Sequence, residues 1–375
     1  MARVRFGDVV KEIKINIDRA TDNHEFYIAG EHMETENIHL TKRGRFEGSD
    51  VGPAFIRLFR PGQILYGSRR TYLKKVAVAD FEGITSNTTF VLETKDQNVM
   101  MQELLPFIML TDSFTEYAIR NSKGSTNPYI LFSDLCAYEF ELPAIEEQRI
   151  LTKRLLACDN VKEAYKHLIA STDELVKSQF VEMFGDMESN PKKWRESTVG
   201  QECYYIKDGP HKSPPYVEEG IPFISTRNVV NGDGIDWSTA KYISEADYLE
   251  CIKKCKPEKG NILYSKGGTT GIAKLIETDK RFANWVHVAV LKFGEQLNGK
   301  FFECMLNMDY CYQQSQRLTK GIANRDFVLS AIAQVKIFVP PIGLQKQYEE
   351  FVRQADKSKY VARQATSNLR TYGIL

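Results

Sequence analysis

An internal repeat is the feature that most constrains what this chain can fold into. Two long stretches, one in the middle of the chain and one at its end, share the hydrophobic spacing of a helix whose buried positions alternate by three and four residues. Tyr348 lies 197 positions after Leu151, and Gln345 lies 197 positions after Gln148. Two unrelated amphipathic helices would not be expected to agree at so many positions. We therefore interpret the chain as two copies of one unit.

The two long helices are expected over residues 143–184 and 341–372. Pro143 suits a first helical turn, and Gly185 suits the left-handed residue that ends a helix. Polar residues such as Arg154, Thr172 and Ser358 interrupt the predicted apolar seam and suggest control of register or further partners. The seam and partner-binding positions are predicted to be Leu151, Val161, Tyr165, Leu168, Leu175, Tyr348, Phe351, Leu369 and Tyr372.

The segments before each helix predict a mixed α+β fold. Short strand-like runs are expected at residues 26–29, 54–59, 63–66, 72–79, 88–93 and 138–142, with a helical stretch over 100–120 that Pro106 interrupts. The run Gly62–Tyr66 recurs 198 positions later as Gly260–Tyr264, although the two segments otherwise diverge. The expected order is a domain at 1–141, a helix at 142–186, a domain at 187–338 and a helix at 339–375. If the second domain has its two ends close together, the helices pair antiparallel.

Composition limits the class of protein but not its partners. A hydrophobic content of 42% is ample for ordinary cores, and no run approaches the 18 or more apolar residues of a membrane span. The chain is expected to be cytosolic and in no contact with a membrane. Its 7 cysteines form no CxxC pair, so reduced and mostly buried thiols are expected and no metal site. A net charge of +1 neither supports nor excludes nucleic acid.

Three stretches come close to catalytic or phosphate-binding motifs. Ser213–Tyr216 resembles an amino-methylating motif, but its serine lacks the amide or carboxylate oxygen that orients the target amine. Glu93 and Lys95, with Asp80, have a spacing seen in nucleases, yet they end an apolar run where charged residues commonly mark the exit of a strand. Gly267–Gly271 lacks the ending of a P-loop and is expected to be a tight turn. No catalytic residue is predicted.

Polar and basic loops suited to binding remain. Arg, Lys, Asn and Thr are the side chains that read base edges or hold phosphates. For any single one of them, an ordinary solvated surface role is at least as good an explanation. The candidate DNA-binding residues are Lys42, Arg43, Arg69, Arg70, Tyr72, Lys74, Asn87, His211, Lys212, Thr226, Arg227, Asn228, Lys266, Thr269, Thr270 and Trp285.

Three parts of the sequence resemble the specificity subunit of type I restriction-modification systems. LPAIEEQRILTKRL, followed by YKHLIASTDELVKSQFVEMFGD, is similar to the central conserved region of that family. GQILYGSRRTYLKKVAVADFEGITSN resembles its first target-recognition domain, and GIPFISTRNV with KGNILYSKGGTTG resembles its second. The resemblance covers essentially the whole chain and includes the order of the two copies.

The resemblance implies a prokaryotic, cytoplasmic, non-catalytic reader of double-stranded DNA. Each recognition domain would bind one half of a bipartite, asymmetric site, and the helices would carry two methyltransferase subunits, with restriction (translocase and nuclease) subunits as further partners. S-adenosylmethionine and ATP would belong to those partners, with no cofactor in this chain. The half-sites are expected about one turn of DNA apart, roughly 34 to 36 Å. The alternatives are an enzyme that methylates or cleaves DNA alone, and a coiled-coil scaffold without a nucleic-acid role.

Overall fold

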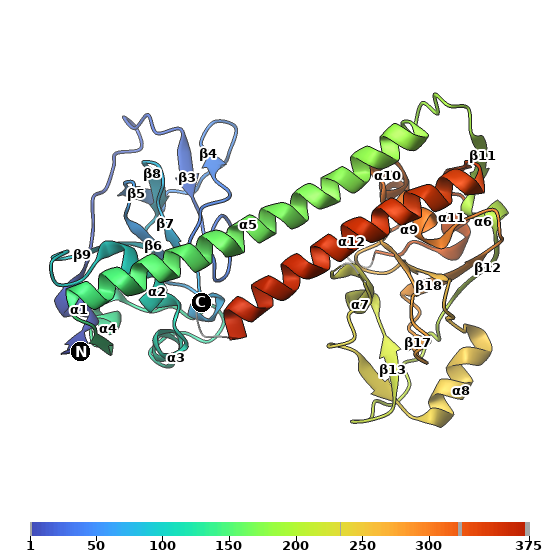
Figure 1. Ribbon diagram of the computed structural model, residues 1–375. Coiled ribbons are helices and arrows are strands. Elements are labelled where there is room, and N and C mark those ends of the chain that lie inside the picture. The colour runs from blue at the N-terminus through green and yellow to red at the C-terminus, as the bar shows by residue number, and fades with distance from the viewer. Residues whose placement is uncertain (1, 233, 322–324, 372–375) are drawn as a thin grey trace. The chain divides into compact units, whose positions relative to one another are not determined.

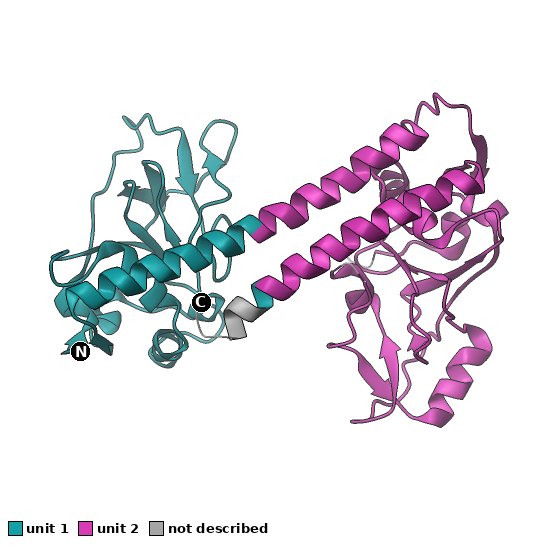
Figure 2. Ribbon diagram, in the orientation of Figure 1, with its two compact units in different colours: residues 1–164, 366–375 teal, residues 165–365 magenta. Residues whose placement is uncertain are grey.

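The chain forms two compact units that share one long helix. The computed structural model describes residues 2–232, 234–321 and 325–371 (Figure 1). Unit 1 comprises residues 1–164 and 366–375, and unit 2 comprises residues 165–365 (Figure 2). The central helix α5, Ile145–Phe184, contributes its first half to unit 1 and its second half to unit 2. Each unit combines small sheets with helices, so the mixed α+β prediction is confirmed.

The described residues of unit 1 form three sheets. The strands are β1 (Ala2–Arg5), β2 (Val10–Glu12), β3 (Phe26–Ile28), β4 (Gly44–Arg45), β5 (Phe55–Phe59), β6 (Ile64–Gly67), β7 (Val76–Val78), β8 (Gly83–Ser86), β9 (Thr89–Thr94) and β10 (Glu139–Leu142). They pair in the orders β1-β10, β2-β9-β6-β7 and β4-β3-β8-β5. The helices are α1 (Phe6–Val9), α2 (Leu105–Leu110), α3 (Asp112–Arg120) and α4 (Phe132–Leu135), with single 3₁₀ turns η1 (Thr71–Leu73) and η2 (Gln102–Leu104).

Unit 2 repeats this plan. Its strands are β11 (Arg195–Thr198), β12 (Cys203–Asp208), β13 (Ile221–Ile224), β14 (Lys241–Ile243), β15 (Ile262–Ser265), β16 (Ala273–Leu275), β17 (Ala283–Asn284), β18 (Val288–Phe293) and β19 (Lys336–Val339). They pair in the orders β11-β19, β12-β18-β15-β16 and β14-β13-β17. The helices are α6 (Val199–Glu202), α7 (Thr226–Val230), α8 (Glu245–Lys254), α9 (Gly299–Asn307), α10 (Asp309–Leu318), α11 (Leu329–Ile332) and α12 (Ile342–Thr371), whose residues 366–371 belong to unit 1.

The strand orders of the two units correspond closely. In the four-stranded sheets, β2-β9-β6-β7 matches β12-β18-β15-β16, and β3 with β8 forms the same parallel pair as β13 with β17. The main difference is that unit 1 adds the edge strand β5, whereas unit 2 carries the helix α8 between β14 and β15. The internal repeat inferred from the sequence is therefore present in the fold.

One glutamine in each unit fixes the start of its long helix in the same way. Gln148 is fully buried; its side-chain carbonyl accepts a hydrogen bond from the Met101 N–H at 3.0 Å, and its amide donates to the backbone oxygens of Val99 and Pro143. Gln345 makes the same three bonds, with the N–H of Asn298 and the oxygens of Gln296 and Pro340. A buried side chain that satisfies three backbone groups holds a helix start firmly against its domain.

Two local predictions need correction. The strand expected over residues 72–79 begins only at Val76, because residues 71–73 form η1 between two left-handed residues. Pro106 does not interrupt a helix but lies in the first turn of α2, where its missing N–H costs nothing, and the break falls at Thr111. Gly185, with a φ of +84°, ends α5 as predicted.

Helix α5 does not bury the predicted seam. Leu151, Val161, Leu168 and Leu175 are 39, 44, 47 and 53% exposed, so the seam prediction is wrong for these four residues. Three buried positions instead lie one residue later in the same heptad pattern and carry polar side chains, namely Thr152, Asp159 and Lys162. These charges are paired: the Asp159 carboxylate lies 2.7 Å from Lys162 Nζ. A hydrophobic pattern could not identify this face, because its ionised members are buried as a pair.

Within unit 2, helix α12 packs antiparallel against the second half of α5. Tyr348, fully buried as predicted, contacts the ring of Phe180 at 5.5 Å, and Lys359 Nζ reaches the Asp173 carboxylate at 2.9 Å. Positions therefore rise along α12 as they fall along α5. Phe351 is only half-buried, whereas its neighbour Val352 is buried. The side chain of Leu369 and all of Tyr372 lie outside the described residues.

Candidate nucleic-acid interface

In unit 1 the candidate residues gather on the turn between β6 and β7, residues 68–75, which we call hairpin loop 1. Ser68 anchors its start, donating its N–H to the Thr88 oxygen and accepting from the Ile130 N–H with its own oxygen. The Arg70 N–H donates to the Pro128 oxygen at 2.7 Å. Arg69, Arg70 and Tyr72 are exposed along this anchored turn. The loop therefore presents two guanidiniums and an aromatic ring on a fixed backbone.

A cleft of about 500 Å³ lies beside hairpin loop 1. Its lining includes Arg69, Arg70 and Lys75 from the loop, and the carboxylates of Glu31 and Asp50 from the segments that flank β3 and β5. The Arg69 guanidinium lies 5.8 Å from the ring centre of Tyr129. The cleft thus combines hydrogen-bond donors with acceptors, which is the combination that a base edge requires.

The other DNA-binding candidates of unit 1 differ in how strongly their side chains interact with the rest of the protein. Lys74 is half-buried and pairs with Asp112 at 2.7 Å and Glu36 at 3.1 Å. Burial alone would lower the pKa of Lys74, but these two carboxylates raise it above its usual value. These ion pairs hold Lys74 against the protein, and its role in DNA binding stays a prediction. Lys42, Arg43 and Asn87 are exposed, and Arg43 lies 4.2 Å from the ring centre of Phe26.

The corresponding turn of unit 2, residues 266–272 between β15 and β16, is hairpin loop 2. Its backbone bonds repeat those of loop 1: the N–H of Lys266 donates to the His287 oxygen, the N–H of Gly268 to the Arg325 oxygen, and the N–H of Phe327 to the Lys266 oxygen. Gly268 and Thr269 are exposed at its tip. The two units therefore present the same loop framework with different side chains.

Three candidates of unit 2 are buried, and the prediction that they contact DNA is corrected for each. Lys266 is 5% exposed and pairs with Asp326 at 2.9 Å and Asp208 at 3.5 Å. Thr270 is 1% exposed, and its hydroxyl lies 3.0 Å from that of Thr319. Polar side chains of this kind stabilise the loop because their partners satisfy them inside the protein.

Asn228 is the third of these residues. It is 2% exposed, and its side-chain oxygen accepts from the Ser225 N–H and hydroxyl at the start of α7. Its amide group donates to the oxygen of Asp236 and to the Thr239 hydroxyl. Asn228 therefore ties helix α7 to the following loop, which leaves no free edge of its amide for a base.

The remaining candidates of unit 2 converge beside hairpin loop 2. Thr226, at the start of α7, donates its hydroxyl to the backbone oxygens of Gly267 and His287. The Trp285 ring packs edge-on against His287, with ring centres 4.5 Å apart. Arg227, His211 and Lys212 are exposed. The start of α7 and the segment around His287 thus meet at this loop.

His287, Asp208 and Asp326 belong to this region although they were not among the sequence candidates. Burial lowers the pKa of His287 and the neighbouring Lys266 lowers it further, against the opposing effect of Asp326 and Asp208. His287 Nδ1 and Trp285 Nε1 are buried and have no hydrogen-bond partner among the residues that the structure describes. The pairing of Lys266 with two carboxylates distant in sequence is a tertiary feature with no local motif, so no sequence signal could have identified it.

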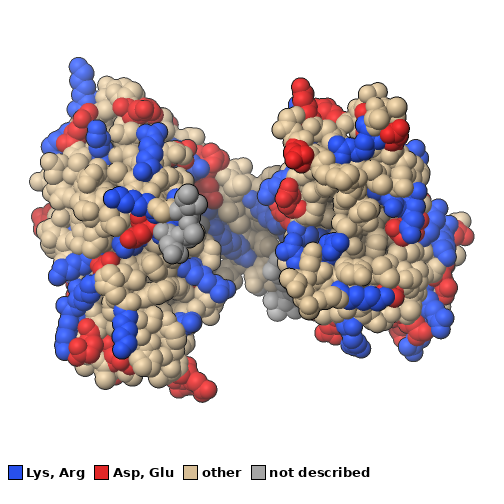
Figure 3. All heavy atoms as spheres, turned by 180° about the vertical axis from the view of Figure 1, so that it is seen from behind, with Lys and Arg blue, Asp and Glu red and all other residues tan. Residues whose placement is uncertain are grey.

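Surface charge alone does not locate a binding face. On the side drawn in Figure 3, Lys and Arg are interspersed with Asp and Glu on each unit instead of gathering into one basic surface. Among the described residues, no group of three or more His, Cys, Asp or Glu side chains could hold a metal ion. No helix in the described ranges is long and apolar enough to cross a membrane. The 7 cysteines are all free thiols.

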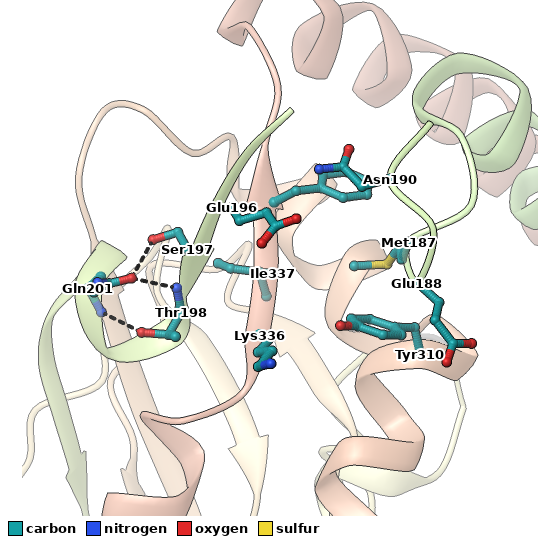
Figure 4. A pocket seen from close by; sticks show the side chains of 11 residues that line it. Met187, Glu188, Asn190, Glu196, Ser197, Thr198, Gln201, Tyr310, Lys336 and Ile337 are labelled. Carbon is teal, nitrogen blue, oxygen red and sulfur yellow. Dashed lines mark hydrogen bonds between the residues drawn. The ribbon is translucent and has the colours of Figure 1, made fainter. Parts of the chain in front are cut away.

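A second cleft, of about 370 Å³, lies in unit 2 away from hairpin loop 2. In Figure 4, Ser197, Thr198 and Gln201 border one side and Met187 and Tyr310 the other. The polar side chains on the first side form the capping box that starts α6, with the Gln201 oxygen accepting from the Thr198 N–H at 3.0 Å. None of the candidate DNA-binding residues lines this cleft.

Comparison with known proteins identifies the family. The model of the type I restriction modification DNA specificity domain matches residues 26–171 and again residues 191–365. The chain is 22% identical over 385 aligned residues to the type I restriction enzyme MjaVIII specificity subunit of Methanocaldococcus jannaschii, covering 94% of this chain and 85% of that one. It is 24% identical to the MjaIX specificity subunit of the same organism, over 80% of this chain and 72% of the relative.

A solved structure shares the fold. The S subunit of the type I restriction-modification system of M. genitalium is 17% identical, with a TM-score of 0.54 over 99% of this chain and 93% of that one. The two family matches fall one in each structural repeat and together cover most of the sequence. The chain therefore belongs to the type I restriction-modification specificity family. As a specificity subunit of that family it is a non-catalytic subunit that recognises DNA.

Proposed function

We propose that unit 1 and unit 2 each read one half of a split, asymmetric site in double-stranded DNA. The observation that supports this proposal is the pair of hairpin loops, which share three anchoring backbone bonds but differ in almost every exposed side chain. If both units recognised the same half-site, their exposed loop side chains would match. Units that recognise different sequences need only the same loop backbone. The target-recognition domains correspond to residues 1–141 and 187–338, and the connecting helical segments to 142–186 and 339–375.

The exposed candidates divide between the two half-sites. Arg69, Arg70 and Tyr72 serve the first, supported by their exposure on an anchored loop beside a cleft. Arg227 and Thr269 serve the second, with His211, Lys212 and Trp285 close by. The candidates that are buried or ion-paired stabilise the conformation of the loops. Residues that contact only phosphate weaken binding to all sequences together, whereas residues that read bases alter the preferred sequence.

The experiment that tests this role is a genome-wide map of methylated motifs in the host with and without the gene. The proposal predicts one motif that disappears with the gene and that consists of two short, different half-sites separated by an unread spacer. A single uninterrupted or palindromic motif would contradict the division of labour between the units. In this proposal the helices set the distance between the two readers, and the half-sites should lie about one helical turn apart, near 34 to 36 Å.

The two long helices form an antiparallel coiled coil that carries two methyltransferase subunits, with restriction subunits as further partners. The contacts of Tyr348 and Lys359 with the second half of α5 support this pairing. Three exposed apolar residues of α5, Val161, Leu168 and Leu175, follow one another at intervals of seven residues and support a partner surface along this helix. Exposed apolar side chains arrayed at heptad spacing are typical of a helix that packs against another helix.

Substituting Leu168 by Asp tests the partner surface. Leu168 is 47% exposed, so the variant should fold normally but lose co-purification with the methyltransferase subunit. Ala170→Asp is the matched control, because Ala170 is exposed on the opposite side of the same helix and receives the same charge. Full-yield assembly of the Leu168→Asp chain, or equal loss with both variants, would show that the stripe is not the docking surface.

S-adenosylmethionine and ATP bind to the partner subunits in this proposal, and the complex acts in the cytoplasm. The sequence contains no glycine loop following a strand in the pattern that binds a nucleotide cofactor. A methylation assay with labelled S-adenosylmethionine tests the assignment. The purified chain should transfer no methyl group to DNA, and addition of the methyltransferase subunit should restore transfer. Activity of the chain alone would contradict it.

A further inference from the structure

Arg70 occupies a backbone conformation that favours glycine. Its φ is +50° and its ψ is +57°, in the left-handed region that side chains other than glycine rarely adopt. The corresponding residue of hairpin loop 2 is Gly268, which has a φ of +71° and makes the matching backbone bond. The fold therefore does not need a side chain at this position. Retaining arginine costs stability relative to glycine, and residues in such conformations cluster at functional sites.

The side chain of Arg70 has no structural role that would offset this cost. Among the described residues, its guanidinium makes no hydrogen bond or ion pair. Lys74, four residues later, is also left-handed with a φ of +45°, but its ammonium group joins Asp112 and Glu36. Lys74 therefore stabilises the loop, whereas Arg70 is exposed at the lining of the 500 Å³ cleft. Within this one loop, Lys74 is a cation with a structural role, whereas Arg70 is a cation available to a ligand.

The surroundings of Arg70 suit a base edge better than a phosphate. A phosphate presents acceptors and negative charge only, so its sites are built from donors. The cleft beside Arg70 contains the cations Arg69 and Lys75 but also the carboxylates Glu31 and Asp50. In the major groove, arginine donates to the two acceptors of guanine, and a carboxylate accepts from the amino group of cytosine. Donors and acceptors in one cleft match a G·C pair.

The backbone of hairpin loop 1 also holds Arg70 in one place. Its N–H donates to the Pro128 oxygen at 2.7 Å, and its own oxygen accepts from the Leu73 N–H at 2.8 Å, which closes the turn η1. Two parallel hydrogen bonds from a guanidinium to a base edge require a fixed direction of approach. The fixed backbone at Arg70 is therefore consistent with a contact between its side chain and a base edge.

We propose that Arg70 reads a guanine in the first half-site. The proposal rests on the function proposed above, since it assigns one residue to one base pair of the site that unit 1 recognises. Hairpin loop 2 lacks a side chain at the matching position, so unit 2 has no equivalent contact at Gly268. The guanine should therefore appear only in the half-site of unit 1 at the position that this loop reaches.

The test is Arg70→Gly in the full chain, assembled with its methyltransferase subunits. Binding of the assembled complex to a pool of randomised duplexes, followed by sequencing, gives the base preference at each position. Arg70→Gly should lose discrimination at one G·C pair of the first half-site by roughly tenfold to a hundredfold. The second half-site should be unchanged. The melting temperature should be equal to or above that of the wild type, because glycine adopts the left-handed conformation without strain.

Lys74→Gly is the matched control from the same loop. It also replaces a left-handed cation by glycine, but it breaks two ion pairs, so it should lower stability and leave the base preference unchanged. An unchanged preference in Arg70→Gly with uniformly weaker binding and a salt slope lower by about one would identify a phosphate contact and overturn the proposal. Loss of preference in both variants would overturn it as well. A wild-type complex with no split motif would instead refute the proposed function.

Discussion

Hairpin loops 1 and 2 are anchored by three corresponding backbone bonds, but their exposed side chains differ. Loop 1 is anchored by Ser68 and the Thr88 oxygen and exposes arginines, whereas loop 2 is anchored by Lys266 and the His287 oxygen and exposes Gly268 and Thr269. In loop 2 the charged side chain lies inside, paired with carboxylates. The comparison teaches that neighbouring strands fix the loop path through main-chain bonds, so the side chains are free to differ between the units.

The two units also differ in how they hold the long helices. In unit 2, Phe180 and Phe184 of α5 pack with Phe301 and Tyr348 in an aromatic cluster in which all four rings are fully buried. In unit 1, α5 is joined to the loop before β4 by the His39 ring, whose Nε2 lies 2.6 Å from the Asp159 carboxylate. Apolar packing is insensitive to pH, whereas an ion pair is not, so the two connections should respond differently to the same perturbation.

Phe180→Ala should have the largest effect on stability. The ring is fully buried and stacks on Phe301 with centres 5.6 Å apart, so truncation removes apolar contacts and leaves a cavity. A loss of about 3 to 5 kcal/mol in the free energy of unfolding of unit 2 is expected. Leu175→Ala on the same helix is the control, because Leu175 is 53% exposed and should change stability by at most about 0.5 kcal/mol. Similar losses for both variants in denaturant titrations would contradict the packing described.

Substitution of the paired glutamines should have a smaller effect that is equal in the two units. Gln148→Ala and Gln345→Ala each leave the buried N–H of Met101 or Asn298 without its acceptor, at a cost of about 1 to 3 kcal/mol. Hydrogen exchange of these two amides locates the effect: each should exchange faster only in its own variant. Unequal losses, or faster exchange at both amides in either variant, would show that the two helix starts are not equivalent.

His39 should make the free energy of unfolding depend on pH, and only in unit 1. We expect this effect to be smaller than those of the Phe180 and glutamine substitutions. The hydrogen bond to Asp159 raises the pKa of His39 against the opposing effect of burial. A raised folded-state pKa means that the protonated ring stabilises the fold below the unfolded pKa of about 6.5. This contribution is lost as the pH rises through the raised pKa. The difference in free energy of unfolding between the wild type and His39→Gln should therefore shrink with rising pH.

Protonation of Asp159 removes the contribution of the same ion pair to stability at low pH. Burial would raise its pKa, but His39 and Lys162 hold it below the usual range, so its contribution is present above about pH 4 and is lost as the pH falls through the lowered pKa. In an Asp159→Asn background, the difference made by His39→Gln in denaturant titrations should no longer shrink with rising pH, because the group that raises the pKa of His39 most is gone. A difference that still shrank there would assign the pH dependence to another group. The position 197 residues after His39 is Asp236, so unit 2 has no equivalent histidine.

The sequence predicted the repeat, the end of α5 and six strands of unit 1, whereas β1, β2, β4 and β8 were missed. Gly185 marks the end of α5, and Pro143 precedes its first turn. The buried face of α5 could not be predicted, because Asp159 and Lys162 are buried as a pair while the more apolar Leu168 stays exposed. Likewise, nothing near Lys266 in the sequence indicates its two carboxylate partners. Burial of charge is decided by tertiary pairing, which hydrophobic periodicity does not record.

The most direct test of the account is an exchange of residues 187–338 for the corresponding domain of a relative with a different motif. Methylated motifs are mapped in a host that carries the hybrid, with the wild-type chain as control. If the two units read independently on a common framework, the hybrid motif keeps the first half-site and the spacer of the wild type and gains the second half-site of the relative. A hybrid motif altered in both halves would contradict independent reading by the two units.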